Sequence, residues 1–314
     1  MATAGTPVRL RPMPLGELLD ESFKLYRRHF AVIAGVALAV ILPTLVVTLI
    51  SGSYRANNFT YLQQLIQNSS DPAALQALQS RQPQFSPIYF LTFPIALLLL
   101  PLTLGAIYYA ATSLAAGHTE TVGSVLLGTL RRYFGILGTA ILSGLPAVGA
   151  VLIVVLLVVI FVALHANAVA VAIGILGGLA AFVFIVWLGI RWALAYAVLL
   201  AERVNPARAL GRSFALVAGN WWRTLGILLL VGILASILQS AIGALFTGIA
   251  ALVPGLNDDL RAAAVTVVSA LVNAIVGAIS PIAITMLYLD LRVRKEGVDL
   301  DQLARQTAPG TAPA

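Results

Sequence analysis

The chain has 314 residues, of which 60% are hydrophobic and 10% are charged, and its formal net charge at pH 7 is +7. Soluble domains carry roughly 25% charged residues, so this composition excludes a soluble globular protein and predicts an all-α integral membrane protein. The chain contains no cysteine, which excludes disulfides, thiolate metal sites and cysteine nucleophiles.

The N-terminal part predicts a tail, a surface helix and a first transmembrane span. Residues 1–13 contain prolines and a glycine and are expected to form a disordered cytoplasmic tail. In residues 14–29, charged and apolar side chains recur on opposite faces at helical spacing, which predicts an amphipathic helix on the membrane surface. Residues 30–50 are uncharged and long enough to cross a bilayer. Because charges precede this span and no small-residue cleavage site follows it, it is not a cleavable signal peptide.

The middle of the chain predicts an outer loop and three further spans. Residues 52–86 are rich in Gln, Asn and Ser and form the predicted outer loop, and residues 87–116 form the second span. The uncharged run that follows is too long for one crossing. It therefore predicts spans at 134–163 and 168–192, joined by a turn at His165-Ala166-Asn167.

The end of the fourth span has two interpretations. If the span ends at Trp192, Arg191 is an interfacial anchor whose head reaches the membrane surface. If the span continues to Ala201, Arg191 lies inside the membrane and needs an internal partner or a lipid phosphate. The family resemblance described below leaves the same point open.

Residues 224–253 and 263–289 predict the fifth and sixth spans, and residues 307–314 a second disordered tail, which leaves residues 14–306 as the six-helix domain. Small residues spaced four apart in the fifth span predict a tight helix–helix seam: Ser236, Ser240, Ala244 and Gly248.

Two polar side chains stand inside the last two spans. Gln239 and Asn273 are expected at similar depth, facing inward and hydrogen-bonded to each other. We favour a packing role for this pair, and the alternative is a polar path through the bundle.

The segments that precede the first, third and fifth spans resemble one another. Each contains Leu-x-x-Ser/Thr, starting at Leu19, Leu126 and Leu210, and ends in basic and aromatic residues. They predict amphipathic interfacial helices and a threefold repeat of helical hairpins. The alternative is that any cytoplasmic entry to a span carries such residues.

Basic residues concentrate on the segments that hold both termini, whereas the opposite side balances its few arginines with aspartates. The positive-inside rule therefore places both termini in the cytoplasm of a multi-pass cell-membrane protein. This basic face predicts binding of anionic lipid headgroups, with topology alone as the alternative. The headgroup candidates are Arg27, Arg28, Arg131, Arg132, Arg191, Arg212, Arg223, Arg292, Arg294 and Lys295.

The sequence offers no catalytic or metal-binding pattern. It contains no His-Glu-x-x-His, Gly-x-Ser-x-Gly or P-loop motif. No carboxylate stands within a predicted span, which argues against a proton-coupled transporter. We expect no enzyme activity, no cofactor and no nucleic-acid partner.

Three motifs resemble the membrane domain that is fused to some glycerophosphodiester phosphodiesterases. They are residues 15–20 (Leu-Gly-Glu-Leu-Leu-Asp), residues 191–195 (Arg-Trp-Ala-Leu-Ala) and residues 287–297 (Leu-Tyr-Leu-Asp-Leu-Arg-Val-Arg-Lys-Glu-Gly). That family's proline after the Arg-Trp element is absent, and Ala197 stands nearby. The resemblance implies a stand-alone membrane module, because the catalytic barrel of the fused proteins needs about 250 further residues.

These observations lead to a non-enzymatic membrane module that binds lipids, or organises a protein partner or a second copy of itself, at the cytoplasmic leaflet. The rival is a small transporter or lipid-translocating permease, with Gln239, Asn273, Ser269 and Arg191 along its route. An intramembrane enzyme is the least favoured class, since the chain offers no set of acid, base and nucleophile.

Overall fold

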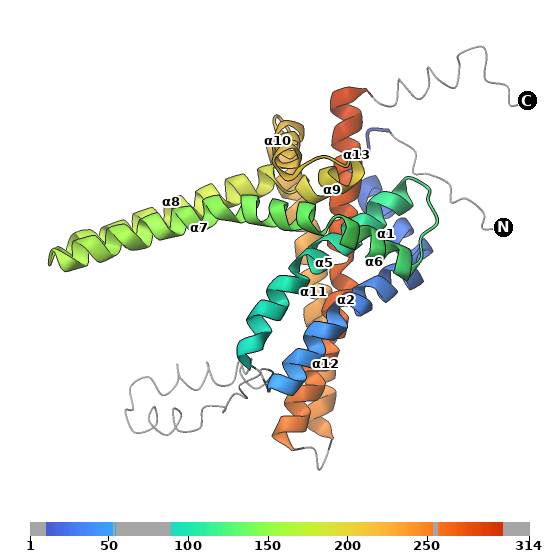
Figure 1. Cartoon of the computed structure of the whole chain (residues 1–314), viewed down its shortest axis with the longest axis horizontal. Coiled ribbons are helices and arrows are strands. Elements are labelled where there is room, and N and C mark those ends of the chain that lie inside the picture. Colours follow the sequence, from blue (N-terminus) through green and yellow to red (C-terminus); the bar gives the residue numbers. More distant parts are fainter. Residues whose placement is uncertain (1–10, 53, 55–88, 254–256, 298–314) are drawn as a thin grey trace, which may run out of the picture.

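A computed structural model of the protein describes residues 11–52, 54, 89–253 and 257–297. Every secondary-structure element in these residues is a helix (Figure 1). Six helical stretches are long and apolar enough to cross a membrane, which confirms the predicted count and makes the protein a polytopic helical membrane protein. The predicted tail 307–314, and nearly all of the tail 1–13 and the loop 52–86, lie outside the described residues.

The helices follow one another in this order: α1 Leu15–Arg28, α2 Phe30–Ser51, α5 Tyr89–Ala115, α6 Val122–Arg131, α7 Tyr133–Ala163, α8 Asn167–Arg191, α9 Ala195–Ala201, α10 Pro206–Val217, α11 Trp221–Leu252, α12 Asp258–Gly277 and α13 Ile279–Glu296. The turn predicted at His165 lies between α7 and α8, and His165 adopts a positive φ of 59° there.

Short helices lead directly into three of the long ones: α1 into α2, α6 into α7 and α10 into α11. The residues at these junctions have similar backbone angles (φ, ψ), with −115°, 26° at His29, −105°, 8° at Arg132 and −121°, 22° at Asn220. The residues four and seven positions after each junction are buried: Ile33 and Val36, Ile136 and Thr139, Thr224 and Ile227. The three entries are thus alike locally, and the threefold repeat stays a prediction.

Two of the apolar stretches are broken. The sixth stretch changes from α12 to α13 at Ala278, three residues before Pro281. Proline has no N–H to donate, and its ring clashes with the carbonyl four residues earlier, here that of Gly277. The fourth stretch breaks after Arg191, where residues 192–194 form a turn before α9 begins.

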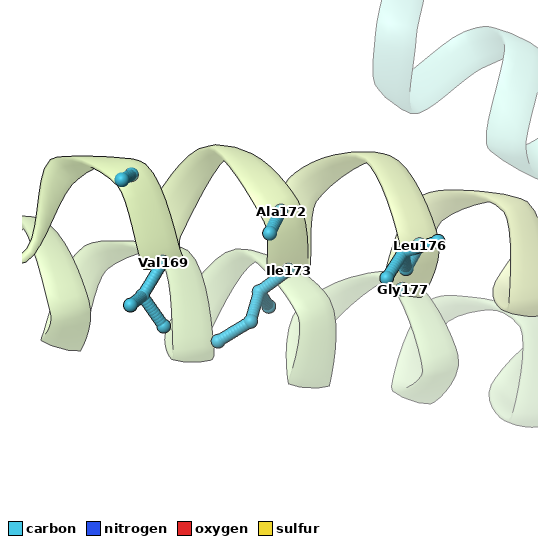
Figure 2. Close-up of a pocket in the computed structure, with 6 residues that line it drawn as sticks. Val169, Ala172, Ile173, Leu176 and Gly177 are labelled. Carbon is cyan, nitrogen blue, oxygen red and sulfur yellow. The ribbon is translucent and has the colours of Figure 1, made fainter.

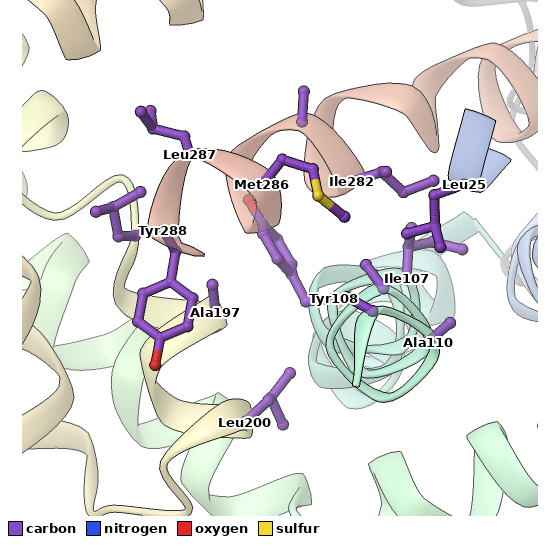
Figure 3. Packing of buried hydrophobic residues seen from close by; sticks show 14 of the residues in the cluster. Leu25, Ile107, Tyr108, Ala110, Ala197, Leu200, Ile282, Met286, Leu287 and Tyr288 are labelled. Carbon is purple, nitrogen blue, oxygen red and sulfur yellow. The ribbon is translucent and has the colours of Figure 1, made fainter. Parts of the chain in front are cut away.

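The best-packed part of the protein lies where α1, α5, α9 and α13 meet. Figure 3 shows side chains of α13, among them Met286 and Ile282, packed toward Ile107 and Tyr108 of α5. Met286 and Ala197 are completely buried. Although α9 is apolar enough to continue a membrane span, its side chains pack against protein instead.

Two helical hairpins extend from this packed part in different directions (Figure 1). α11 and α12 form one of them, with α2 packed against α12 and α5 against α2. α7 and α8 form the other, and no residue of the most apolar stretch of α7 is buried within the protein. A surface of this kind faces lipid tails, which are as apolar as the side chains themselves.

Candidate functional site

The C-terminal half of α13 carries a buried carboxylate that joins three parts of the chain. Asp290 is completely buried, and its Oδ2 lies 2.8 Å from Nη2 of Arg223 on α11. One helical turn further along α13, Arg294 donates from Nε to both oxygens of Asp290 at 3.0 Å. The carboxylate is therefore paired with two guanidinium groups.

The third part is the backbone just before α1. The N–H of Met13 donates to Oδ1 of Asp290 at 2.7 Å, and its carbonyl accepts from Arg223 at 2.7 Å and from Arg294 at 3.0 Å. Removing one partner from a buried ion pair costs about 3–5 kcal/mol, because the other charge is left uncompensated. This group, here called the Asp290 network, consequently ties the start of α1 to α11 and α13.

A second set of charges lies along the next face of α13. Glu202, at the end of α9, accepts from Nε of Arg212 at 3.2 Å and from the Tyr288 hydroxyl at 3.1 Å. Glu296 pairs with both Arg212 and Arg292. Burial disfavours the charged form of Arg212, but the carboxylates of Glu202 and Glu296 outweigh this effect and raise its pKa. Arg212 is thus held in its charged form between α9, α10 and α13.

Lys295 forms hydrogen bonds with the C-terminal end of α10. Its ammonium donates to the carbonyls of Ala215 and Ala218, at the C-terminus of α10. The last carbonyls of a helix lack partners within the helix and carry partial negative charge, so this lysine satisfies them from α13.

The structure therefore divides the predicted headgroup residues into two groups. The internally bonded group consists of Arg212, Arg223, Arg292, Arg294 and Lys295. The remaining candidates are Arg27, Arg131, Arg132 and Arg191, while Arg28 also has an interaction within the protein. Sequence reasoning did not single out Asp290, Glu202 and Glu296 as site residues, although for Asp290 and Glu202 a carboxylate close behind an apolar run was the available signal.

Exposed arginines stand at two of the three junctions between short and long helices. Arg27 and Arg28 are exposed in the last turn of α1, and Arg131 is exposed at the end of α6. Arg132, partly exposed, is the junction residue that follows. These side chains reach the level at which α2 and α7 begin.

Arg191 stands apart from the other candidates. Its guanidinium carbon lies 4.4 Å from the ring centre of Phe214 and 5.3 Å from that of Trp187. Its backbone carbonyl accepts from the Ser213 hydroxyl at 2.8 Å, and that hydroxyl accepts from the N–H of Leu194 at 3.2 Å. Ser213 of α10 thereby fixes the turn between α8 and α9. Arg191 accordingly lies at the end of α8, but the apolar stretch continues to Ala201, so both interpretations of its depth stay predictions.

The two intramembrane polar residues have different surroundings. Asn273 donates to the carbonyl of Ser269 in its own helix at 2.8 Å. Nε2 of Gln239 lies next to Gly277, 3.6 Å from where a Cβ would be. The expected direct bond between Gln239 and Asn273 is not among the hydrogen bonds of the described residues, where Asn273 is exposed and bonds within α12.

Asn273 also lines a cavity of about 170 Å³ between α2, α5 and α12. The cavity is otherwise mostly apolar, with Thr103 as its second polar side chain and Pro281 at the helix break. Arg191 is not among its lining residues.

The prediction of a helix–helix seam in the fifth span is wrong for the packing within this chain. Ser236, Ser240, Ala244 and Gly248 are all exposed on α11, and a Cβ added to Gly248 would meet nothing within 4 Å. The less exposed positions of this region are Ala235, Gln239, Ile242 and Gly243. Small residues allow close packing, but the position of α12 decides which face of α11 is used.

The α7–α8 hairpin carries an open apolar hollow of about 450 Å³. Figure 2 shows the labelled side chains around it, including Val169, Ile173 and Leu176 of α8. All of its lining residues are apolar or glycine, so it offers no group that would orient a polar ligand. Within residues 11–52, 54, 89–253 and 257–297, no cluster of three His, Asp or Glu side chains is suited to a metal ion.

Comparison with known proteins finds that one family model matches this chain. The model of the family described as "Domain of unknown function (DUF8558)" matches residues 7–305. No curated protein matches the chain, and no solved structure does. The family match makes no link to glycerophosphodiester phosphodiesterase membrane domains, so that resemblance stays a prediction. Since the match covers nearly the whole chain, the protein belongs to the DUF8558 family.

Proposed function

We propose that this protein is a non-enzymatic membrane module that gathers anionic lipids at the leaflet facing its basic end, which the positive-inside rule assigns to the cytoplasm. The observation that carries the proposal is the exposed arginines at the entries to α2 and α7. Arg27 and Arg131 are exposed and Arg132 is partly exposed, whereas the arginines of α10, α11 and α13 described above pair with carboxylates.

The difference between these groups of arginines has a physical reason. A charge already paired inside the protein gains little from a lipid phosphate, because it would first have to leave its partner. Arg27, Arg131 and Arg132 have no ion pair within the part of the chain that the structure describes. Each basic residue near an anionic membrane surface contributes about 1 kcal/mol of attraction.

The resemblance to the phosphodiesterase-associated membrane domain supports the same proposal. In the fused proteins the membrane part is separate from the catalytic barrel, which implies a role for such a module without hydrolysis. Recruitment of a protein partner, or of a second copy, through the same basic surface would be compatible with lipid binding there.

The proposal is tested with the full chain purified in a neutral detergent. Native mass spectrometry measures how many phosphatidylglycerol and phosphatidylcholine molecules remain bound from an equimolar mixture. Wild type should prefer phosphatidylglycerol, and R27Q/R131Q/R132Q should lose this preference, since about 1 kcal/mol for each of the three residues amounts to roughly a hundredfold in total.

The matched control is R27K/R131K/R132K, which keeps the charges and should keep the preference. Equal retention of both lipids by the wild-type protein, or an unchanged preference in the glutamine variant, would refute the proposal.

A lipid-translocating permease is the second candidate, favoured by the cavity that Asn273 and Thr103 line. A scrambling assay with fluorescent phosphatidylcholine in reconstituted vesicles tests it. If translocation occurs, N273L should fill the cavity and slow it. A wild-type rate equal to that of protein-free vesicles would remove this candidate.

A further inference from the structure

We propose that Arg191, Phe214 and Trp187 form a binding site for the phosphate group of a membrane phospholipid. The proposal rests on the proposed function, because it names one particular site within the lipid-binding basic end. It depends on an arginine that the fold holds in place but does not pair with an anion.

The Arg191 side chain lacks the partners that its neighbours have. Within the residues that the structure describes, its Nε is buried without a hydrogen-bond partner, and no carboxylate forms an ion pair with the guanidinium. By contrast, Arg212 and Arg223 each contact a carboxylate. The fold therefore leaves the donors of Arg191 for an acceptor from elsewhere.

The aromatic contacts do not remove this need. Phe214 and Trp187 lie 4.4 Å and 5.3 Å from the guanidinium carbon, and such contacts use the face of the guanidinium group. Its two Nη groups form no hydrogen bond with the described residues and remain available, whereas Nε is buried. A stacked guanidinium with free edge donors is well suited to a phosphate, whose oxygens can accept two parallel hydrogen bonds.

The position of Arg191 is fixed by contacts to its backbone. The Ser213 hydroxyl donates to the Arg191 carbonyl at 2.8 Å and accepts from Leu194 at 3.2 Å. Phe214 follows Ser213 directly, so a single turn of α10 holds the backbone of Arg191 and also supplies a ring against its side chain. Binding would then require little ordering of the protein.

The tryptophans indicate the depth of the site. The chain has four tryptophans, and all of them flank Arg191 or begin α11: Trp187, Trp192, Trp221 and Trp222. The indole of Trp221 points to the carbonyl of Trp187 at 3.5 Å, which brings the start of α11 to the end of α8. Tryptophan is enriched at the membrane–water interface, where phospholipid phosphates are the abundant anions.

The test uses the full chain in detergent, titrated with dioctanoyl phosphatidylglycerol, dioctanoyl phosphatidylcholine or inorganic phosphate. Tryptophan fluorescence reports binding, since the tryptophans surround the site. We expect phosphatidylglycerol to bind most tightly and R191Q to weaken its binding about tenfold, the effect of losing a charge-assisted contact. W222F, which changes an exposed ring that is not part of the site, should retain binding.

The matched control is R208Q, which removes the same charge from an exposed arginine of α10 and should bind like wild type. Equal phosphatidylglycerol binding by R191Q and wild type would overturn the site. If R27Q/R131Q/R132Q still lowered lipid retention in that case, the proposed function would survive the loss of this site. If inorganic phosphate bound as tightly as the lipid, and through Arg191, the assignment to a lipid source would be overturned.

Folding is checked by gel filtration of each variant. If R191Q is not monodisperse, F214L and R191K take its place, because the first removes one ring and the second removes the planar fork. Both should bind phosphatidylglycerol severalfold more weakly than wild type. Wild-type affinity in both would overturn the proposal.

Discussion

The Asp290 network and the α7–α8 hairpin hold helices together in opposite ways. In the network, a buried carboxylate, two guanidinium groups and a piece of backbone form directional bonds between α11, α13 and the start of α1. In the hairpin, Gly174 and Gly177 let α8 approach Val158 and Val154 of α7, and the contact is one of shape alone. The comparison teaches that directional bonds join the helices at the polar end of this membrane protein and close packing joins them in the hairpin, since lipid supplies no hydrophobic force between helices.

The largest expected effect comes from removing the centre of the network. D290A leaves Arg223 and Arg294 without their carboxylate and should destabilise the protein by about 3–5 kcal/mol. Thermal unfolding in detergent would measure this as a clear fall in melting temperature. The control E21Q removes a carboxylate from the exposed pair with Lys24 and should leave the melting temperature unchanged. A similar melting temperature for D290A and wild type would contradict the importance of the network.

A smaller loss of stability is expected when the turn between α8 and α9 is altered. S213A removes a completely buried hydroxyl that accepts from Leu194 and donates to Arg191. An unsatisfied buried N–H costs about 1–3 kcal/mol, and the melting temperature should fall accordingly. S236A is the matched control, because Ser236 is exposed and bonds only within its own helix. An equal fall in melting temperature in both variants would show that the Ser213 hydrogen bonds do not contribute more to stability than that of Ser236.

The hairpin should respond to shape and not to charge. A Cβ at Gly177 would lie 3.3 Å from Val154, whereas one at Gly178 would meet nothing within 4 Å. G177L should therefore push α8 away from α7 and destabilise the protein by about 1–3 kcal/mol at most, while G178L should be neutral. Thermal unfolding of the two variants side by side checks this, and an equal response to both would mean that the hairpin is loosely packed.

The smallest expected effect is a pH dependence at the junction between α1 and α2. Burial and, to a lesser extent, the charge of Arg28 lower the pKa of His29. A lowered pKa in the folded state means that folding favours neutral histidine. The resulting stability is present above the unfolded pKa of about 6.5 and is lost as the pH falls through the folded value. Between pH 7.5 and pH 5, H29Q should lose less melting temperature than wild type, and an identical loss would exclude His29 as the cause.

The sequence was sufficient for the helical architecture because the physical signal is local. A run of uncharged residues must form a helix in lipid, and the turn at His165 follows from the length of the run that contains it. These features need no knowledge of which helices become neighbours.

The pairing of charges could not be predicted, because it depends on neighbours far apart in the chain. Met13 and Asp290 are 277 positions apart, and nothing in the sequence selects Arg223 as the arginine that joins them. An end of the fourth span at Trp192 was one of two sequence interpretations, and the sequence did not decide between them, since no proline or glycine lies within residues 192–194 and α9 is as apolar as a span. The exposed row of small residues that includes Ser240 could not be interpreted from sequence for the same reason. Its spacing identifies a helix face made of small side chains, but it does not show whether another helix packs on that face.

The contact between Met13 and Arg294 has a consequence for anything attached to the protein. Residues 13 and 294 adjoin the points where the two tails leave the described fold, and one hydrogen bond of 3.0 Å connects them. A domain fused to either tail would thus be anchored over the same small area. A pull on the N-terminal tail would act on α11 and α13 through the bonds of Arg223 and Arg294 to Met13, as well as on α1 through the chain itself.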